Sequence, residues 1–483
     1  MAAKRGAAKT AGGKKAAGKK KAGASDAGLD AGRPADRRDA FAELARRRAE
    51  GEVVFTPRVL SGFARRCHVR QTLREDHATR ITGVPDAAQA KFDKLARSTY
   101  DFFRGTALLF YRDLAGDDAW MPSVLTLGDV HPENFGVMPS ADGTPMFGVN
   151  DFDEAHFAPF TWDIKRGAVG FFIAAGAEGL SKKKRAKVVR AFVRGYCEGL
   201  RAFVDNDLET ERQLRLDNSP PLIRALIEGA MTGRADWLGE LLDDKRRGFR
   251  PTTEIVPQTS RVDDFQAIVD RYVKENGISI PGRTDAFRVK DAAEKRGSGT
   301  ASLGLTRYFV LIAGPDDDGS DDIVLEMKRA RRSALDGLAP TAQAAHADAE
   351  AGRVVNAQAV HLVGGDPFYG KVEIEGRSHL VRERSPFKDE MDLDDLDAKS
   401  WRRYAFECGR ALAQAHALAD EDTGVGEGSV EARILDAVEP LGLFVEDMVR
   451  FAREAAKRVA RDHALFCEDH ALGAFTSIDR HWK

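Results

Sequence analysis

The segment Gly128-Asp129-Val130-His131-Pro132-Glu133-Asn134 and the shorter segment Asn150-Asp151-Phe152-Asp153 decide the fold expected for this chain. They close the short apolar runs SVLTLGDV and MFGVNDF, which are separated by the turn-forming stretch PSADGTP. Such runs predict two strands joined by a loop. Three acids and an amide would then converge where the strands end. We call the two segments the 128–134 loop and the NDFD segment.

Phosphoryl transfer is the chemistry that needs such a set of side chains. One carboxylate orients and deprotonates the acceptor, while an amide and a second carboxylate hold Mg²⁺ on the phosphates. In protein kinases the base precedes the metal-binding asparagine by five positions, which is the spacing of Asp129 and Asn134. We therefore expect Asp129 to be the base, with Asn134 and Asp151 on the metal. The alternative is that Asp129 and Asp151 only cap turns.

Three further residues are expected to support this arrangement. His131 is interpreted as a residue that braces its loop rather than as a metal ligand or general base. Asp153 adds a further acid close to Asp151 in the NDFD segment. Asp163, in the run WDIK after Pro159, would lie at a helix start and hold the backbone amides of the 128–134 loop.

A second cluster is the glycine-rich stretch GSGTASLG, in which Gly297, Gly299 and Gly304 would let backbone N–H groups approach phosphate oxygens. It is followed one strand later by Lys328, and an inward lysine on an apolar strand is costly unless it meets a phosphate or carboxylate. Together they predict a nucleotide-binding hairpin. Glu350 is the candidate counter-ion of Lys328, and Asp348 is the alternative. The competing interpretation is a surface hairpin with Lys328 in solvent.

The remaining pattern indicates an α+β chain. Helical spacing of apolar residues runs from Asp39 to about Tyr111 and from Trp162 to Val204, with shorter helices to about Asn276. After Pro281, three strand-like runs predict an antiparallel meander. We then expect a helix from Thr341, as N-cap, to Leu362, a hairpin around Gly376-Arg377, and helices over Trp401–Ala419 and Leu441–Phe466. The expected domains are a disordered basic tail (1–38), a helical lobe (39–280), an antiparallel sheet lobe (281–400) and helices that complete the helical lobe (401–483).

Charge separates the tail from the body. The chain has 483 residues and a formal charge of -2, but residues 1–25 carry seven Lys and one Arg and no acid. The rest has 66 basic and 76 acidic side chains, a charge of -10. The tail could hold nucleic acid non-specifically through counterion release, or serve only as a solubilising extension. The body shows no basic groove in its sequence.

The cellular setting follows from what the sequence lacks. No run of 18 apolar residues occurs and the N-terminal stretch has no apolar core like that of a signal peptide, so we expect no membrane partner. Four cysteines lie far apart without a C-x-x-C pair, which favours a reducing, cytoplasmic compartment.

Several longer runs carry a resemblance to a known family. FFRGTALLFYRDLA, LTLGDVHPENFGV, NDFDEAHFAPFTWDIKR, GTASLGLTRYFVLIAG and YAFECGRALAQAHA resemble the uncharacterised bacterial family catalogued as domain of unknown function 2252, over about residues 50 to 470. Within them, GDVHPENF and DFD followed by WDIK are similar to the catalytic loop and metal-binding segment of aminoglycoside phosphotransferases and related small-molecule kinases. The likeness implies Asp129 as base, with Asn134 and Asp151 on the metal.

The order of the parts differs from that of those kinases, in which the glycine hairpin and lysine strand precede the catalytic loop. Here the loop comes first, and the helix that resembles the one leading into it lies near residue 410. We therefore expect a circularly permuted, two-lobed protein-kinase-like fold, which surface chain ends permit. The expected function is an ATP- and Mg²⁺-dependent phosphotransferase acting on an unknown, small-molecule acceptor by phosphoryl or adenylyl transfer. The alternatives are a catalytically silent nucleotide-binding regulator and a nucleic-acid-associated protein anchored by its tail.

Overall fold

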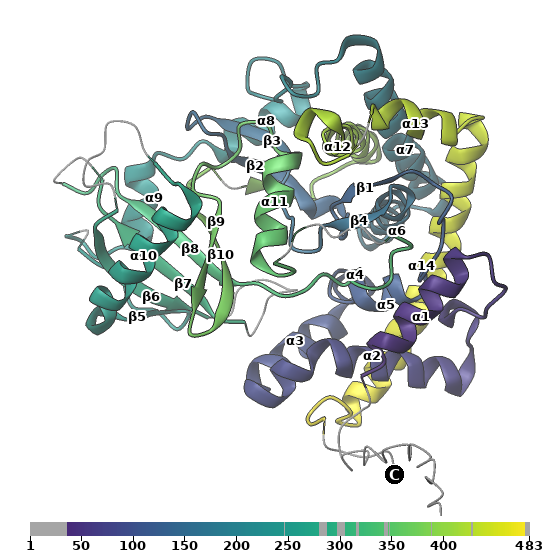
Figure 1. Cartoon of the computed structure of the whole chain (residues 1–483), viewed down its shortest axis with the longest axis horizontal. Coiled ribbons are helices and arrows are strands. Elements are labelled where there is room, and N and C mark those ends of the chain that lie inside the picture. Colours follow the sequence, from purple (N-terminus) through teal and green to yellow (C-terminus); the bar gives the residue numbers. More distant parts are fainter. Residues whose placement is uncertain are drawn as a thin grey trace, which may run out of the picture.

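The computed structural model describes residues 36–245, 247–279, 287–296, 305–314, 318–341, 346, 348–387, 389–426 and 428–478. Within them the chain forms an antiparallel sheet lobe and a larger helical lobe (Figure 1). The α+β class expected from the sequence is confirmed. Within the described residues, no helix combines the length and the hydropathy needed to cross a membrane.

The sheet lobe contains a six-stranded antiparallel sheet with the strand order β5-β6-β7-β8-β10-β9. Its strands are β5 (Ile255–Pro257), β6 (Val289–Lys295), β7 (Arg307–Ile312), β8 (Ile323–Arg329), β9 (Gly370–Ile374) and β10 (Arg377–Glu383). Its helices are α9 (Arg234–Leu241), α10 (Val262–Asn276) and α11 (Ala351–His361). The predicted meander and the predicted hairpin, which turns at Glu375 and Gly376 with positive φ, are therefore present.

Strand β8 is apolar because both faces of the sheet are covered. Ile323, Leu325 and Met327 face the core that α10 closes, while Val324 belongs to the core beneath α9. Side chains alternate along a strand, so Lys328 follows Glu326 and Val324 on the second face. The lysine therefore lies on an inward face at the end of a buried strand.

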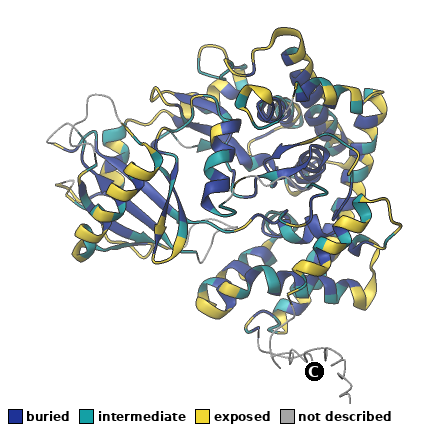
Figure 2. Cartoon of the chain, in the orientation of Figure 1, coloured by how far each residue is buried: buried dark blue, intermediate teal, exposed yellow. Residues whose placement is uncertain are grey.

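The helical lobe surrounds α6, which is buried along most of its length (Figure 2). Its helices are α1 (Arg38–Ala49), α2 (Gly62–Gly83), α3 (Pro85–Arg97), α4 (Thr99–Arg104), α5 (Ala107–Arg112), α6 (Thr161–Ala177), α7 (Lys182–Asn206), α8 (Pro221–Ala230), α12 (Ala398–Ala417), α13 (Val430–Ala437) and α14 (Leu441–Ala471). Helices α7 and α12 cross closely, because a Cβ on Gly195 would meet the Phe406 carbonyl oxygen at 2.1 Å and one on Gly409 the Phe192 carbonyl oxygen at 2.1 Å.

Two small sheets accompany the six-stranded sheet in the described residues. One pairs β1 (Ser123–Thr126) with β4 (His156–Pro159), and the other has the order β11-β2-β3, with β11 (Asp389–Glu390), β2 (Phe135–Pro139) and β3 (Pro145–Val149). The prediction that SVLTLGDV and MFGVNDF are two strands joined by one loop is wrong, because β2 lies between β1 and β3 and pairs with β3, whereas β1 pairs with β4, which follows the NDFD segment. PSADGTP forms the β2–β3 turn, where Ser140 and Thr144 hydrogen-bond to Asp142.

Two other boundaries differ from those expected. Helices α9 and α10, assigned to the helical lobe from their sequence position, pack on the six-stranded sheet because their apolar stripes close its two faces. Helix α11 begins at Ala351, not at Thr341, and Glu350 is its N-cap residue. Of the expected basic tail, residues 1–35 lie outside the described residues, and α1 begins at Arg38.

Candidate functional site

The 128–134 loop begins at a glycine that no other residue could replace without strain. Gly128 has φ +79°, and a Cβ there would meet the Glu154 carbonyl oxygen at 2.2 Å. Because the loop passes close to Glu154, which directly follows the NDFD segment, Gly128 needs both a positive φ and the absence of a side chain. The close approach places Asp129 at the start of the loop, next to the segment that follows β3.

Asp129 is paired with a buried arginine. Its Oδ1 accepts hydrogen bonds from Nε and Nη2 of Arg166 at 2.9 and 2.7 Å. Arg166, on α6, is fully buried, stacks its guanidinium 3.7 Å from the Phe103 ring centroid and also donates to the Phe103 carbonyl oxygen. Both guanidinium hydrogen bonds go to Oδ1, and Oδ2 lies 4.0 Å from Nε2 of His131. The pair therefore fixes the orientation of the Asp129 carboxylate.

Asp163 holds the start of the loop. Its carboxylate accepts hydrogen bonds from the backbone N–H groups of Leu127 at 2.7 Å and Gly128 at 3.0 Å, as the sequence analysis expected. It lies in the first turn of α6 and is fully buried. The ring of His416 lies against it, with Nε2 3.1 Å from Oδ2, and Nδ1 of the same ring is 2.8 Å from the Tyr196 hydroxyl. A carboxylate accepts only, so Nε2 of His416 donates to Asp163, and in a neutral ring Nδ1 accepts from the Tyr196 hydroxyl.

Asn134 also braces the backbone of the loop, and His131 is buried within the loop. Asn134 donates from Nδ2 to the Asp129 carbonyl oxygen at 2.6 Å, and its own carbonyl oxygen accepts from the backbone N–H of Asn150 at 3.2 Å. His131 is buried, and its pKa is lowered well below the usual value by burial and by the charges of Arg104 and Arg166. Nδ1 of the ring has no hydrogen-bond partner, so the bracing role expected of His131 stays a prediction.

The NDFD segment meets the sheet lobe through an ion pair. The ammonium group of Lys328 contacts the Asp153 carboxylate, although the two residues are 175 positions apart. Burial opposes ionisation of Asp153, but Lys328 prevails and lowers the pKa of Asp153 to about 2. Burial and the neighbouring Asp153 charge raise the pKa of Asp151. The expected pairing of Lys328 with Glu350 is not observed.

The remaining cofactor-binding predictions fall elsewhere. Gly297, Gly299 and Gly304 lie outside the described residues. Glu350 lines a cleft together with Arg329 and Arg331, and Lys328 is not among the residues that line it. Asp348, the alternative partner, accepts hydrogen bonds from backbone N–H groups and contacts Lys371 instead. The structure thus joins Lys328 to Asp153, and Asn134 to the backbone of Asp129 and Asn150, but it does not bring Glu350 to Lys328.

Besides Arg166, three charged residues of the site were missed in the sequence: Glu154, Arg331 and Arg353. Glu154 is buried, contacts the guanidinium of Arg331, and accepts a hydrogen bond from the Ala334 backbone N–H at 2.5 Å. Arg353, on α11, donates to the carbonyl oxygens of Ala155 at 2.6 Å and Asp153 at 2.7 Å. These contacts tie the NDFD segment to the sheet lobe. The apolar surroundings of Arg353 in α11 were the available signal, because a lone arginine on a buried helix needs acceptors.

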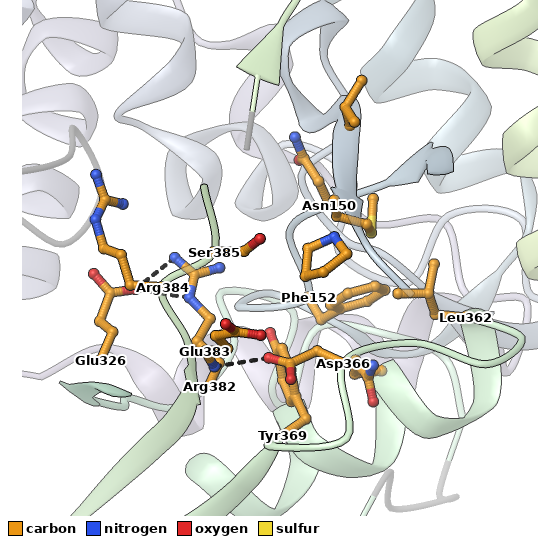
Figure 3. Close-up of a pocket in the computed structure, with 14 residues that line it drawn as sticks. Asn150, Phe152, Glu326, Leu362, Asp366, Tyr369, Arg382, Glu383, Arg384 and Ser385 are labelled. Atoms are coloured by element: carbon orange, nitrogen blue, oxygen red, sulfur yellow. Dashed lines mark hydrogen bonds and ion pairs between the residues drawn. The ribbon is translucent and has the colours of Figure 1, made fainter. Parts of the chain in front are cut away.

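A cavity adjoins the NDFD segment (Figure 3). Its walls come from both lobes: Asn150, Phe152 and Leu362 on one side, and Arg382, Arg384 and Ser385 of the chain leaving β10 on the other. The lining is mostly apolar, but Nδ2 of Asn150 is buried there without a hydrogen-bond partner. The cavity therefore offers an apolar slot with an unused donor beside the acidic segment.

A basic groove that the sequence analysis did not anticipate runs along α7 and α12. It has a volume of about 820 Å³ and is lined by six cationic side chains and two acids. The cations are Lys187, Arg190, Arg194, Lys399, Arg402 and Arg403. Residues spaced three and four apart share a helix face, and the glycine crossing of α7 and α12 places the two basic faces side by side.

Comparisons with known proteins bear on the family of the chain. No curated protein and no solved structure matches the sequence. A family model described as an uncharacterised protein conserved in bacteria matches residues 80–469, within the span over which the resemblance was expected. This match covers most of the chain, which therefore belongs to the family catalogued as domain of unknown function 2252 (DUF2252).

Proposed function

We propose that the chain is an ATP- and Mg²⁺-dependent phosphotransferase with a two-lobed, kinase-like site. The contact between Lys328 and Asp153 carries the proposal, because it joins the lysine strand of one lobe to the acidic segment of the other. In kinases a strand lysine, a loop asparagine and a segment aspartate act together on the phosphates and their metal ions. Here the corresponding residues are Lys328, Asn134 and Asp151.

Each residue of the 128–134 loop has a distinct role in this proposal. Asp129 would accept the proton of the acceptor hydroxyl or amine at Oδ2, because Arg166 occupies Oδ1. Arg166 orients that carboxylate and Asp163 holds the loop backbone. Positioned groups of this kind account for most catalysis of phosphoryl transfer, in which little covalent chemistry is left to the protein.

The donor set suits Mg²⁺. Asp151 and Asn134 offer a carboxylate and an amide oxygen, which are the hard ligands that Mg²⁺ takes alongside substrate phosphates and water. Burial and the charge of Asp153 raise the pKa of Asp151, so a cation at this position would stabilise its ionised form. When bound, the metal would neutralise charge on the phosphates.

The nucleotide would occupy the space between the lobes. The cavity of Figure 3 has a volume of about 50 Å³, so it would have to widen to take a flat heterocyclic base, for which the unpartnered Asn150 amide would be a donor. The base would then lie beside Phe152, and the phosphates would extend toward Lys328. Lys328 would exchange its contact with Asp153 for the phosphates as they bind.

The order of the elements supports a circular permutation. Along the chain, β10 and then α12 follow the β6–β7 hairpin, the lysine strand β8 and helix α11. Helix α12 packs against the 128–134 loop, where the Tyr404 hydroxyl donates to the carbonyl oxygens of Pro132 and Phe135. In the related kinases that loop would come next in the chain, whereas here it comes from the N-terminal half. The arrangement departs from kinases in α11, which carries Arg353 where an acid would face the lysine.

The acceptor is proposed to be a small molecule, on the resemblance alone. A silent nucleotide-binding regulator remains the alternative for the site itself. Nucleic acid contact through the basic tail remains a separate prediction, and the groove along α7 and α12 offers polyanions a second surface.

The first test is nucleotide binding. ATP with Mg²⁺ should raise the melting temperature, because a ligand that binds only the folded state stabilises it. Lys328→Ala should reduce the shift, whereas Lys371→Ala, a lysine of the same sheet paired with Asp348, should not. Absence of any ATP-dependent stabilisation of the wild type at millimolar nucleotide would refute the proposal.

The second test is turnover. ATP consumption is followed while pools of metabolites are offered as acceptors. Asp129→Asn should lower transfer by roughly a hundredfold or more with ATP binding retained, and Asp151→Asn should also weaken Mg²⁺-dependent ATP binding. Equal turnover by the wild type and Asp129→Asn would leave the silent regulator as the better interpretation.

A further inference from the structure

Acidic side chains gather where α7 ends and where the chain turns from α12 into α13. Asp207, Glu209 and Asp422 each place a carboxylate oxygen within 4.8 Å of the other two. Asp420 and Glu431 add negative charge close by. We call these five residues the α7–α13 acidic cluster. It lies on elements other than those that carry the phosphotransferase residues.

The buried members of the cluster have unused oxygens. Glu209 is 1% exposed and Glu431 is 5% exposed, and Oε2 of each has no hydrogen-bond partner. Among the described residues, no Lys, Arg or His forms an ion pair with any member of the cluster. A buried carboxylate without a donor or a counter-charge is costly, so either protons or a cation must compensate the group.

Side chains hold the turns that carry the cluster through hydrogen bonds to the backbone. Asp207 ends α7 in the left-handed conformation, with φ 52° and ψ 47°. Gln414, on α12, donates from Nε2 to the Glu209 carbonyl oxygen at 2.8 Å. On the facing turn, Oδ1 of Asp420 accepts from the Asp422 backbone N–H at 3.0 Å. The carboxylates therefore converge from two braced turns, so binding an ion would require little reorganisation.

We propose that Asp207, Glu209 and Asp422 bind a hard divalent cation, with Ca²⁺ preferred over Mg²⁺. The cluster offers only carboxylate oxygens and contains no His or Cys, which disfavours zinc and the softer transition metals. Ligands from two irregular turns suit the larger and more variable coordination shell of Ca²⁺ better than the strict octahedron of Mg²⁺. Asp207 and Asp422 are exposed, so water can complete the shell.

The ion would tie the end of α7 to the turn between α12 and α13. Tyr196 on α7 and His416 on α12 form the hydrogen-bond chain that reaches Asp163 and the 128–134 loop. Ca²⁺ would therefore stabilise the helix pair that supports the loop without contacting the loop itself. The site is independent of the proposed phosphotransferase activity.

The test is a calorimetric titration of CaCl₂ into full-length protein treated with EDTA, without nucleotide, together with thermal melts. Wild type should bind one Ca²⁺ and melt at a higher temperature. Glu209→Gln and the exposed Asp422→Asn should each weaken Ca²⁺ binding by about tenfold or more. Without metal at neutral pH or above, Glu209→Gln should melt above the wild type, because a buried charge is removed.

Two controls separate this site from others. Asp217→Asn removes an exposed carboxylate outside the cluster and should leave Ca²⁺ binding unchanged. Asp151→Asn, in the candidate phosphotransferase site, should also leave it unchanged, so that failure of either proposal can be recognised separately. Absence of Ca²⁺ binding by the wild type at millimolar concentration, or unaltered binding by Asp422→Asn, would overturn the inference.

Discussion

Replacing Asp163 with Asn tests how the 128–134 loop is held. The wild-type carboxylate is fully buried and accepts from the Leu127 and Gly128 backbone N–H groups at 2.7 and 3.0 Å, with His416 Nε2 at 3.1 Å. Asn has nearly the same shape but only one oxygen, so its NH₂ group must face one of these donors. A buried N–H group is then left without an acceptor.

The magnitude follows from those contacts. Hydrogen bonds to a charged group contribute about 1.5–3 kcal/mol each, and an unsatisfied buried polar group costs about 1–3 kcal/mol. Removing one partner of a buried charged network typically costs about 3–5 kcal/mol. We therefore expect Asp163→Asn to lower the free energy of unfolding by about 3–5 kcal/mol, allowing for partial retention of the hydrogen bonds by the amide oxygen.

Urea unfolding followed by circular dichroism measures the change. The matched control is Asp397→Asn: Asp397 also accepts from two backbone N–H groups, those of Lys399 and Ser400, but at an exposed helix N-cap. Asn is as good an N-cap as Asp, so the control should change stability by no more than about 0.5 kcal/mol. If the two variants lost equal stability, the buried network would not be what holds the loop.

Two further predictions concern the cavity and the helix crossing. Burial, together with the charge of Glu383, raises the pKa of Asp366 from 3.8 to about 7. The folded state therefore binds the proton of the Asp366 carboxyl more tightly than the unfolded state does. The free energy of unfolding should then fall as the pH rises from about 4 to about 7. The free energy of unfolding of Asp366→Asn, measured with urea, should therefore rise relative to that of the wild type between about pH 4 and pH 7, and a difference independent of pH would contradict this assignment. Gly409→Ala should lower the free energy of unfolding by about 1–3 kcal/mol or more, because its Cβ would meet the Phe192 carbonyl oxygen at 2.1 Å. A lower melting temperature would report this loss. Gly442→Ala in α14, where no atom lies within 4 Å of the added Cβ, should be neutral or stabilising, and equal effects of the two would argue against a close crossing.

Local pattern was enough to predict the features that depend on near neighbours. Strand and helix periodicity predicted the meander of β6, β7 and β8, because alternation along a strand reflects which face is buried. The helix-start position of Asp163 predicted its hydrogen bonds to the loop, since a carboxylate at a helix start lies among backbone donors. The family could also be predicted, because its motifs are contiguous runs of residues.

Tertiary structure alone decided the partners of the charged residues. Lys328 pairs with Asp153 and Asp129 with Arg166, across 175 and 37 positions of the chain. An ion pair between distant residues produces no periodic pattern in the sequence, because it depends on which buried surfaces meet. Any of several nearby acids fits the same local pattern. The local pattern indicates Glu350 as the counter-ion, but α11 begins only at Ala351 and Glu350 lines another cleft. The basic groove and the acidic cluster arise in the same way, because helices α7 and α12 assemble them from residues about 200 positions apart.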